Sequence, residues 1–249
     1  MRKIGIILND MEYKSVITAV FLSRPNRFVA KVLVDGKEDT AHVKNTGRCK
    51  ELLVPGCTVY LEDHSLSMGK RKYRYSLIAV LKERENGTLL VNMDSQAPNK
   101  AAYEALSVGT IKIPGTGELT YIRPETVYGD SRFDFYFEDN EGRKGFAEVK
   151  GCTLEKGGIA SFPDAPTERG VKHIEELIKA KKDGYYASLI FIVQMEGMKY
   201  IRPNDETHPA FGEALRRAAK AGVSVAAYEC RVFPCAMTVS KEVPVSLAE

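Results

Sequence analysis

The chain has 249 residues, of which 44% are hydrophobic and 28% are charged, and its formal net charge is +3. This length accommodates one or two domains with their own cores, and the composition excludes a largely disordered chain. The most apolar runs, 4–8 and 189–193, are strand-sized and far short of the roughly 18 residues that cross a bilayer. We therefore expect a cytoplasmic protein without membrane association.

The cysteines and histidines show no metal-binding or disulfide pattern. The five cysteines form no CxxC pair, and the four histidines have neither HxH nor HExxH spacing. We therefore expect reduced cysteines and no histidine-built metal site.

Short strand-like runs, broken by turn residues, dominate the first third of the chain. They predict a small β-barrel or sandwich, which we place at residues 1–86. Residues 14–85 carry a net charge of +6, whereas the rest of the chain carries −3. The strand-like runs are 27–34, 58–62 and 73–81, with turns at 35–36, 45–47, 55–56 and 68–69.

Residues 87–249 have a different pattern, in which helical and strand periodicities alternate. The order αβββαβαβ predicts a mixed α/β domain. The expected helices are 98–106, 168–182 and 209–221, and the expected strands are 120–127, 132–138, 144–151, 188–195 and 223–228.

The strongest chemical signal lies on two of these strands, which are expected to pair as a hairpin. Alternation places Phe133, Phe135 and Phe137 on one face and turns Asp134 to the other. In the second strand Glu148 and Lys150 share a face, so the hairpin can gather the three charged side chains on one side.

Two neighbouring carboxylates repel each other unless a cation joins them, and Mg²⁺ favours carboxylates together with water and phosphate oxygens. Asp134 and Glu148 are therefore the candidate ligands of Mg²⁺ or Mn²⁺, with the Val149 carbonyl as a further ligand. Lys150 would orient a metal-bound water or stabilise charge on a phosphate. Glu104 on the first helix is a candidate third acid.

This D-x₁₃-E-x-K spacing is the core of the PD-(D/E)xK nuclease pattern, but it is also compatible with an exposed hairpin of solvated charges. Three features favour the nuclease interpretation. They are the αβββαβ order around the triplet, the aromatic reverse face of the Asp134 strand, and basic surface elsewhere in the chain.

The segment 161–173 predicts a capped helix start that also suits a phosphate. Asp164 or Thr167 would cap the helix, and Arg169, Lys172 and His173 follow in its first turns. For His173 a phosphate contact or a structural hydrogen bond is favoured over catalysis.

Basic residues in the first domain are the candidate DNA contacts. Charges interleaved with tyrosines can bind phosphates and stack bases, although a charged strand edge would explain the same pattern. Arg132 before the triplet is a further candidate phosphate contact. The candidates in the first domain are Lys44, Arg48, Lys70, Arg71, Lys72, Tyr73 and Arg74.

These residues together resemble the sugar fermentation stimulation protein A family over about residues 14–230. The stretch Phe162-Pro163-Asp164-Ala165 with Thr167-Glu168-Arg169-Gly170 and His173 is its most specific part. The resemblance implies an α/β protein in which an OB-fold-like β-barrel precedes a restriction-endonuclease-like domain with a mixed sheet. It also implies DNA binding and a role in regulating sugar (maltose) metabolism. Further motifs are Asn45-Thr46-Gly47, Pro55-Gly56, Lys70-Arg71-Lys72-Tyr73, Val91-Asn92, Tyr128-Gly129, Ser131-Arg132-Phe133-Asp134-Phe135 and Glu148-Val149-Lys150.

Three functions stay open at this point. The first is a DNA-binding protein whose nuclease-like site hydrolyses phosphodiesters with Mg²⁺ or Mn²⁺. The second is a non-enzymatic DNA-binding regulator with a vestigial site, and the third is a small-molecule sensor without DNA contact. A homodimer is an additional expectation.

Overall fold

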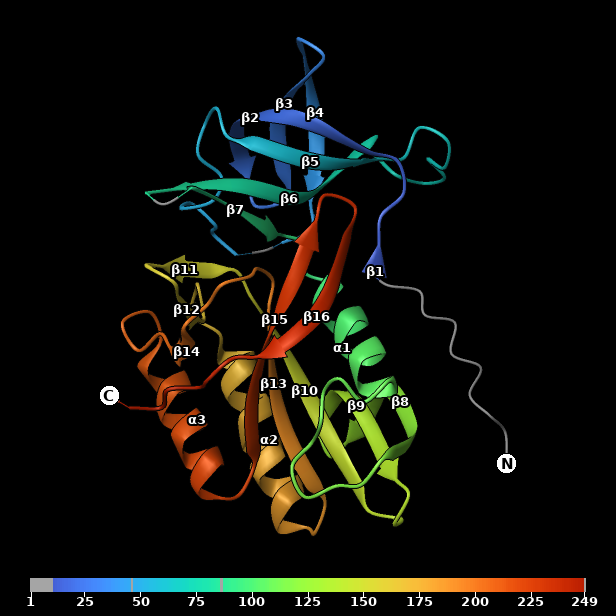
Figure 1. Cartoon of the computed structure of the whole chain (residues 1–249), viewed down its shortest axis with the longest axis vertical. Helices are drawn as coiled ribbons and strands as arrows, with labels where there is room; N and C mark the ends of the chain where they lie inside the picture. The colour runs from blue at the N-terminus through green and yellow to red at the C-terminus, as the bar shows by residue number, and fades with distance from the viewer. Residues whose placement is uncertain (1–10, 46, 86, 249) are drawn as a thin grey trace.

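The computed structural model describes residues 11–45, 47–85 and 87–248 (Figure 1). The apolar run 4–8 and the turn residue Thr46 lie outside the described residues. Among the described residues, no helix is long and apolar enough to span a membrane.

The first sheet closes into a barrel. Its strand order is β4-β3-β2-β5-β6-β7, and an additional pairing of β4 with β6 closes the ring of β2 to β6, with β7 continuing beside β6. Alternation along β3 turns Ala30 and Val32 into the interior of the barrel, where both are fully buried. The strands are β2 Val16–Asn26, β3 Val29–Val34, β4 Lys37–Val43, β5 Thr58–Asp63, β6 Tyr75–Arg84 and β7 Gly87–Asn92.

The sheet pairings do not coincide with the expected boundary at residue 86. Strand β7 belongs to the barrel sheet, while β1 (Met11–Glu12) pairs with β16 in the second domain. We therefore propose that the boundary lies after Asn92.

The second domain contains the expected helices and strands together with several short strands that the sequence pattern did not predict. The helices are α1 Ala97–Ser107, α2 Glu168–Lys182 and α3 Pro209–Lys220. The strands are β8 Leu119–Tyr128, β9 Ser131–Asp139, β10 Lys144–Cys152, β11 Leu154–Lys156, β12 Ile159–Phe162, β13 Tyr186–Val193, β14 Tyr200–Pro203, β15 Ser224–Phe233 and β16 Ala236–Glu242.

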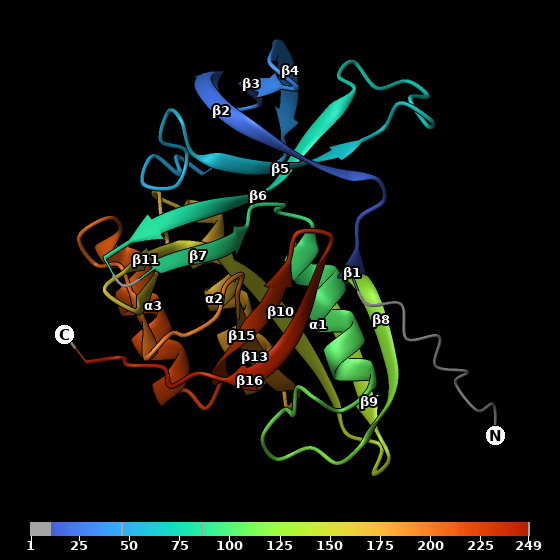
Figure 2. The same ribbon diagram turned by 45° about the horizontal axis from the view of Figure 1, so that its top comes forward.

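A mixed sheet of order β1-β16-β15-β13-β10-β9-β8 forms the centre of this domain, and a small sheet, β11-β12-β14, lies beside it. The three central strands β10, β13 and β15 are parallel, and the outer strands are antiparallel. Helix α1 lies on one face, and α2 and α3 lie on the other (Figures 1 and 2). In β13, Ile190 and Ile192 pack in the cluster that contains α1, whereas Leu189 and Phe191 pack in the cluster that contains α2 and α3.

Polar contacts and a shared core join the two domains. One apolar cluster contains both barrel residues and the side chains of α2 and α3. Lys82 of β6 donates to the Glu155 carboxylate at 2.6 Å, and the Gln194 side chain donates to the Asn92 carbonyl at 3.0 Å. The barrel is therefore held directly against the second domain.

Candidate active site

Strands β9 and β10 stop pairing at the residues that carry the candidate chemistry. Their ladder ends at Phe135 opposite Ala147. Beyond it the Asp134 carboxylate takes the place of a backbone partner, because its Oδ2 accepts the Val149 N–H at 2.7 Å. The amide and carbonyl of one extended residue point to the same edge, so the Val149 carbonyl also faces this gap.

The aromatic residues around Asp134 are buried as expected, but they do not share one face. Phe135 and Phe137 pack in the cluster with α1. Phe133 belongs to the other cluster, where its ring centroid lies 5.3 Å from that of Phe146. The strand therefore loses its regular alternation at Asp134, which turns that carboxylate toward the gap between β9 and β10.

A residue of helix α1 holds the second oxygen of the Asp134 carboxylate. The Asn99 side chain donates to Asp134 Oδ1 at 2.7 Å. Burial, followed by the negative charge of Glu148, raises the pKa of Asp134 to about 6. Asn99 was missed in the sequence because a neutral amide after a proline carries no metal or catalytic signature, and the role of Glu104 stays a prediction.

Glu148 is 2% exposed, and two side chains contact one of its carboxylate oxygens. Lys150 Nζ donates to Glu148 Oε1 at 2.7 Å, and His173 Nδ1 contacts the same oxygen. Burial raises the pKa of Glu148, but the hydrogen bond from His173 and the charge of Lys150 outweigh it and lower the pKa overall. Its other oxygen, Oε2, is buried and has no hydrogen-bond partner among the described residues.

Helix α2 packs against β10 and carries His173, which contacts Glu148 of that strand. The helix begins at the Thr167 cap, whose hydroxyl accepts the Gly170 N–H at 3.1 Å, so Thr167 rather than Asp164 is the cap. Arg169 Nε donates to His173 Nε2 at 3.3 Å, which leaves the proton of a neutral ring on Nδ1, facing Glu148. Of the two roles favoured for His173, this placement supports the structural hydrogen bond.

The remaining predicted phosphate contacts of the second domain lie on the surface. Arg132 is exposed and pairs with Glu125 at 2.8 Å. Arg169 is also exposed, and Lys172 donates to the Asp130 carbonyl at 3.2 Å. All three side chains remain accessible to a polyanion.

The predicted basic residues of the barrel fall into two groups. The larger group lies on the loop between β5 and β6, which projects toward the right in Figure 1. Arg74 there pairs with Asp63 at 2.6 Å, and Lys72 lies over the Tyr73 ring. In the smaller group, Arg48 is exposed, but Lys44 is largely buried in an ion pair. The exposed basic residues of the β5–β6 loop are Lys70, Arg71, Lys72 and Arg74.

The ion pair of Lys44 is a feature of the domain junction. Lys44 Nζ lies 2.7 Å from the buried Asp94 carboxylate. This ammonium is therefore mostly withdrawn from solvent, and its predicted phosphate contact gains no support from the structure.

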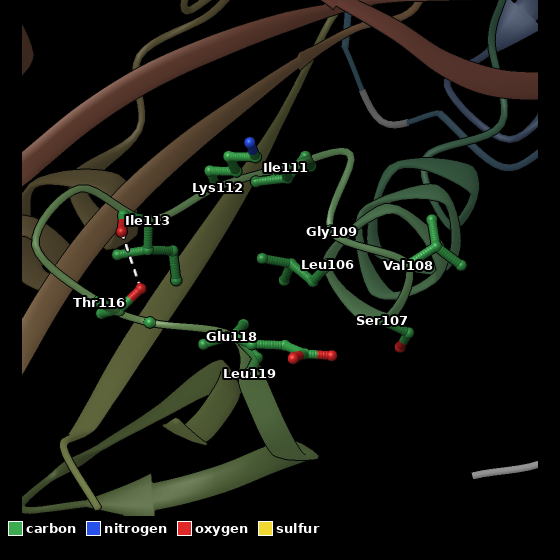
Figure 3. A pocket seen from close by; sticks show the side chains of 11 residues that line it. Leu106, Ser107, Val108, Gly109, Ile111, Lys112, Ile113, Thr116, Glu118 and Leu119 are labelled. Atoms are coloured by element: carbon green, nitrogen blue, oxygen red, sulfur yellow. Dashed lines mark hydrogen bonds between the residues drawn. The ribbon is translucent and has the colours of Figure 1, made fainter. Parts of the chain in front are cut away.

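A cavity of about 580 Å³ lies away from the triplet, between the end of α1 and the loop that leads to β8 (Figure 3). Leu106, Ile111, Ile113 and Leu119 provide its apolar wall. None of the predicted site residues lines it, so cavity size alone does not locate the chemistry of this protein.

The metal ligands available at the triplet are few. Among the described residues there is no group of three or more His, Cys, Asp or Glu side chains arranged to hold a metal ion. The candidate set therefore consists of the two carboxylates, the Val149 carbonyl and water.

Comparison with known proteins agrees with the two-domain architecture. The family described as "SfsA N-terminal OB domain" matches residues 22–92, and the one described as "Sugar fermentation stimulation protein RE domain" matches residues 96–235. The expected fold class, an OB-fold-like barrel followed by a restriction-endonuclease-like α/β domain with a mixed sheet, is confirmed.

Relatives with the family's name match most of this chain. A sugar fermentation stimulation protein homolog of Desulfitobacterium hafniense (strain Y51) is 50% identical over 239 residues, which cover 96% of this chain and 100% of the relative. One from Alkaliphilus oremlandii is 51% identical over 222 residues, covering 88% and 92%. The solved structure of Pyrococcus furiosus SfsA in complex with Ca²⁺ is 30% identical, has a TM-score of 0.82, and covers 95% of this chain and 98% of that one.

Proposed function

This chain belongs to the sugar fermentation stimulation protein family, and on that premise we propose that it binds DNA and holds a divalent cation at Asp134 and Glu148. The observation that carries the proposal is the buried Oε2 of Glu148. This oxygen has no hydrogen-bond partner among the described residues, although a buried carboxylate oxygen normally has one.

The donor set fits a hard cation. Burial raises the pKa of Asp134, and repulsion by Glu148 raises it further. A cation between the two carboxylates would relieve that repulsion. Oxygen ligands of this kind suit Mg²⁺, Mn²⁺ and Ca²⁺. The relative from Pyrococcus furiosus, whose structure was solved with Ca²⁺, supports a divalent site in the family, and we propose Mg²⁺ or Mn²⁺ as the ion used here.

The chain's own residues account for the rest of the site. Asn99 and the Val149 N–H hold Asp134, while Lys150 and His173 hold Glu148 in its ionised form. A bound cation supplies charge stabilisation at a phosphate and acidifies water. Arg132, Arg169 and Lys172 would bind flanking phosphates, and the β5–β6 loop of the barrel would hold a more distant part of the DNA.

Binding of Ca²⁺ or Mg²⁺ to the purified protein, measured by isothermal titration calorimetry, tests the metal site. We expect Asp134→Asn to abolish the binding heat. Glu206→Gln, a change at an exposed acid outside the triplet, should retain it. Unchanged titration of the Asp134→Asn protein would overturn the assignment.

DNA binding is tested by its dependence on salt. If exposed lysines and arginines contact phosphates, affinity falls steeply as salt rises, since each contact releases counterions. The absence of measurable binding to either single- or double-stranded DNA at low salt would favour a small-molecule sensor instead.

The two leading functions, nuclease and non-enzymatic regulator, differ in whether the site cleaves DNA. The Lys150 ammonium lies 2.7 Å from Glu148, and the described residues provide no third acidic or histidine ligand. These observations favour the non-enzymatic regulator, whereas the intact triplet favours the nuclease. Cleavage assays with Mg²⁺ and Mn²⁺, with Lys150→Met as the variant, separate them. Cleavage by the wild type that is lost in a variant with normal DNA binding supports the nuclease.

The name of the family supports a biological role in sugar metabolism. We propose that DNA binding by this protein regulates sugar (maltose-type) metabolism in the cytoplasm. A deletion strain whose growth on maltose and maltose-induced transcripts match those of the parent would contradict this role.

A further inference from the structure

A second cavity lies next to the triplet, where the barrel meets the second domain. Its volume is about 110 Å³, and we call it the junction pocket. It is lined by Asn45 from the barrel, Ser95 and Pro98 at the start of α1, Gly151 at the end of β10, and Gln194 after β13.

The junction pocket and the triplet share their supporting elements. Gly151 follows Lys150 in β10, one strand residue or about 3.3 Å further along. Pro98 precedes Asn99, whose side chain donates to Asp134. Alternation turns Gly151 toward α1 and Lys150 toward the other face, so the pocket adjoins the triplet on the side of Asp134 and Asn99. A ligand that places a phosphate at Asp134 can therefore place its neighbouring group in the pocket.

Glycine at 151 keeps the pocket open. A Cβ atom there would lie 2.6 Å from Gln194 Oε1 and 2.6 Å from a Pro98 ring carbon. The Gln194 Nε2 donates to Asn92 and to the Asp94 carbonyl, which directs Oε1 toward Gly151. The pocket thus contains a hydrogen-bond acceptor held in place by buried contacts.

The other walls combine flat apolar surface with a second acceptor. Phe162 lines the pocket, and its ring is supported by Phe211, whose centroid lies 5.0 Å away. Asp164 lines it as well, with its carboxylate against Gly47 and its Oδ2 4.0 Å from Cys49 Sγ of the barrel. A ring wall and convergent polar groups are the pattern by which enzymes hold an unstacked base.

We propose that the junction pocket receives one unpaired pyrimidine base of the bound DNA, with cytosine preferred over thymine. The inference rests on the proposed function, because it assumes that DNA reaches the triplet. At about 110 Å³ the junction pocket is smaller than an engineered cavity of about 150 Å³ that holds benzene, so it has room for the edge of one ring and none for a purine. Asp164 and Gln194 Oε1 are two acceptors, and the exocyclic amino group of cytosine presents two N–H bonds, whereas unpaired thymine presents one, at N3.

The test compares three otherwise identical duplexes that carry, at one central position, an unpaired cytosine, an unpaired thymine or an abasic residue. A fully paired duplex is the reference, and fluorescence anisotropy with Ca²⁺ measures the affinities. We expect unpaired cytosine to bind roughly tenfold more tightly than the abasic residue. Thymine should lie between the two.

Two variants assign any preference to the junction pocket. Ser161→Leu fills it from β12 and should abolish the preference for a base over the abasic residue. Asp164→Asn should remove only the preference for cytosine over thymine. Ser107→Leu, at an exposed position at the end of α1, is the matched control and should bind as the wild type does.

The outcomes separate this inference from the proposed function. If none of the duplexes binds, the proposed function and the base pocket both fail. If paired and abasic duplexes bind as tightly as the cytosine duplex, DNA binding stands and the pocket inference is overturned. A stable Ser161→Leu protein that keeps the full preference for cytosine would also overturn it.

Discussion

At the scale of single residues, Asp134 determines how the site responds to pH. Its pKa of about 6 in the folded protein exceeds its ordinary value of 3.8. The folded state therefore holds this proton more tightly than the unfolded state does. Its contribution to stability is present at low pH and is lost as the pH rises from about 4 to about 6.

The same proton competes with the proposed cation. A metal ligand must be deprotonated, so we expect Ca²⁺ affinity to fall roughly tenfold for each pH unit below the pKa of Asp134. Calorimetric titrations at a series of pH values measure this change. Affinity that stays constant from pH 7 down to about pH 5 would show that Asp134 is not a ligand.

His173 is the second residue whose role can be tested alone. The His173→Ala change removes a donor from the buried Glu148 carboxylate and raises the pKa of Glu148. We expect the free energy of unfolding to fall by about 1–3 kcal/mol, measured by urea denaturation. Lys179→Ala, at an exposed position of the same helix, is the control. Equal stability of the two variants would contradict the structural role of His173.

At the scale of elements, close packing of β10 between its neighbours holds the triplet in place. A Cβ atom at Gly145 would lie 2.5 Å from the Tyr186 backbone oxygen and 2.3 Å from the Phe137 ring. Gly145→Ala should therefore destabilise the protein by about 1–3 kcal/mol and weaken metal binding, since β10 must shift. Thermal unfolding and calorimetry check both effects. Lys144→Ala at the exposed neighbouring position should change neither.

The sequence predicted the long amphipathic elements well. The bounds of α2 match the prediction, because Thr167 caps the helix and apolar residues recur at helical spacing. Among the longer strands, β2, β4, β7 and β16 were missed: β2 contains Pro25, and β16 lies between β15 and the two-residue edge strand β1, a position that no local pattern identifies. Elements whose stability comes from distant partners leave little trace in their own residues.

The site was predicted to a similar extent. Asp134, Glu148 and Lys150 do lie together, because the alternation of a hairpin is a local property. The contacts of Asn99 and His173 arise from helices that pack on opposite faces of the sheet, 35 and 25 residues away from their partners. Sequence spacing alone does not contain that packing.

At the scale of the whole molecule, buried charges join the barrel to the second domain. Lys82→Met would leave the Glu155 carboxylate, whose side chain is 2% exposed, without its cation. Removing one partner of a buried ion pair typically costs about 3–5 kcal/mol. Adding Glu155→Leu to Lys82→Met should recover most of that loss in urea unfolding. If the single variant is as stable as the wild type, the pair does not hold the domains together.

The shared core has a consequence for how this architecture can diversify. The apolar cluster that spans both domains, the Lys44–Asp94 pair and the Asn92–Gln194 contact each need one partner from either side of the boundary. A barrel acquired from an unrelated gene would have to supply all of these partners at once. Recombination at the boundary is therefore expected to yield unstable chimaeras, so the two halves should be inherited together.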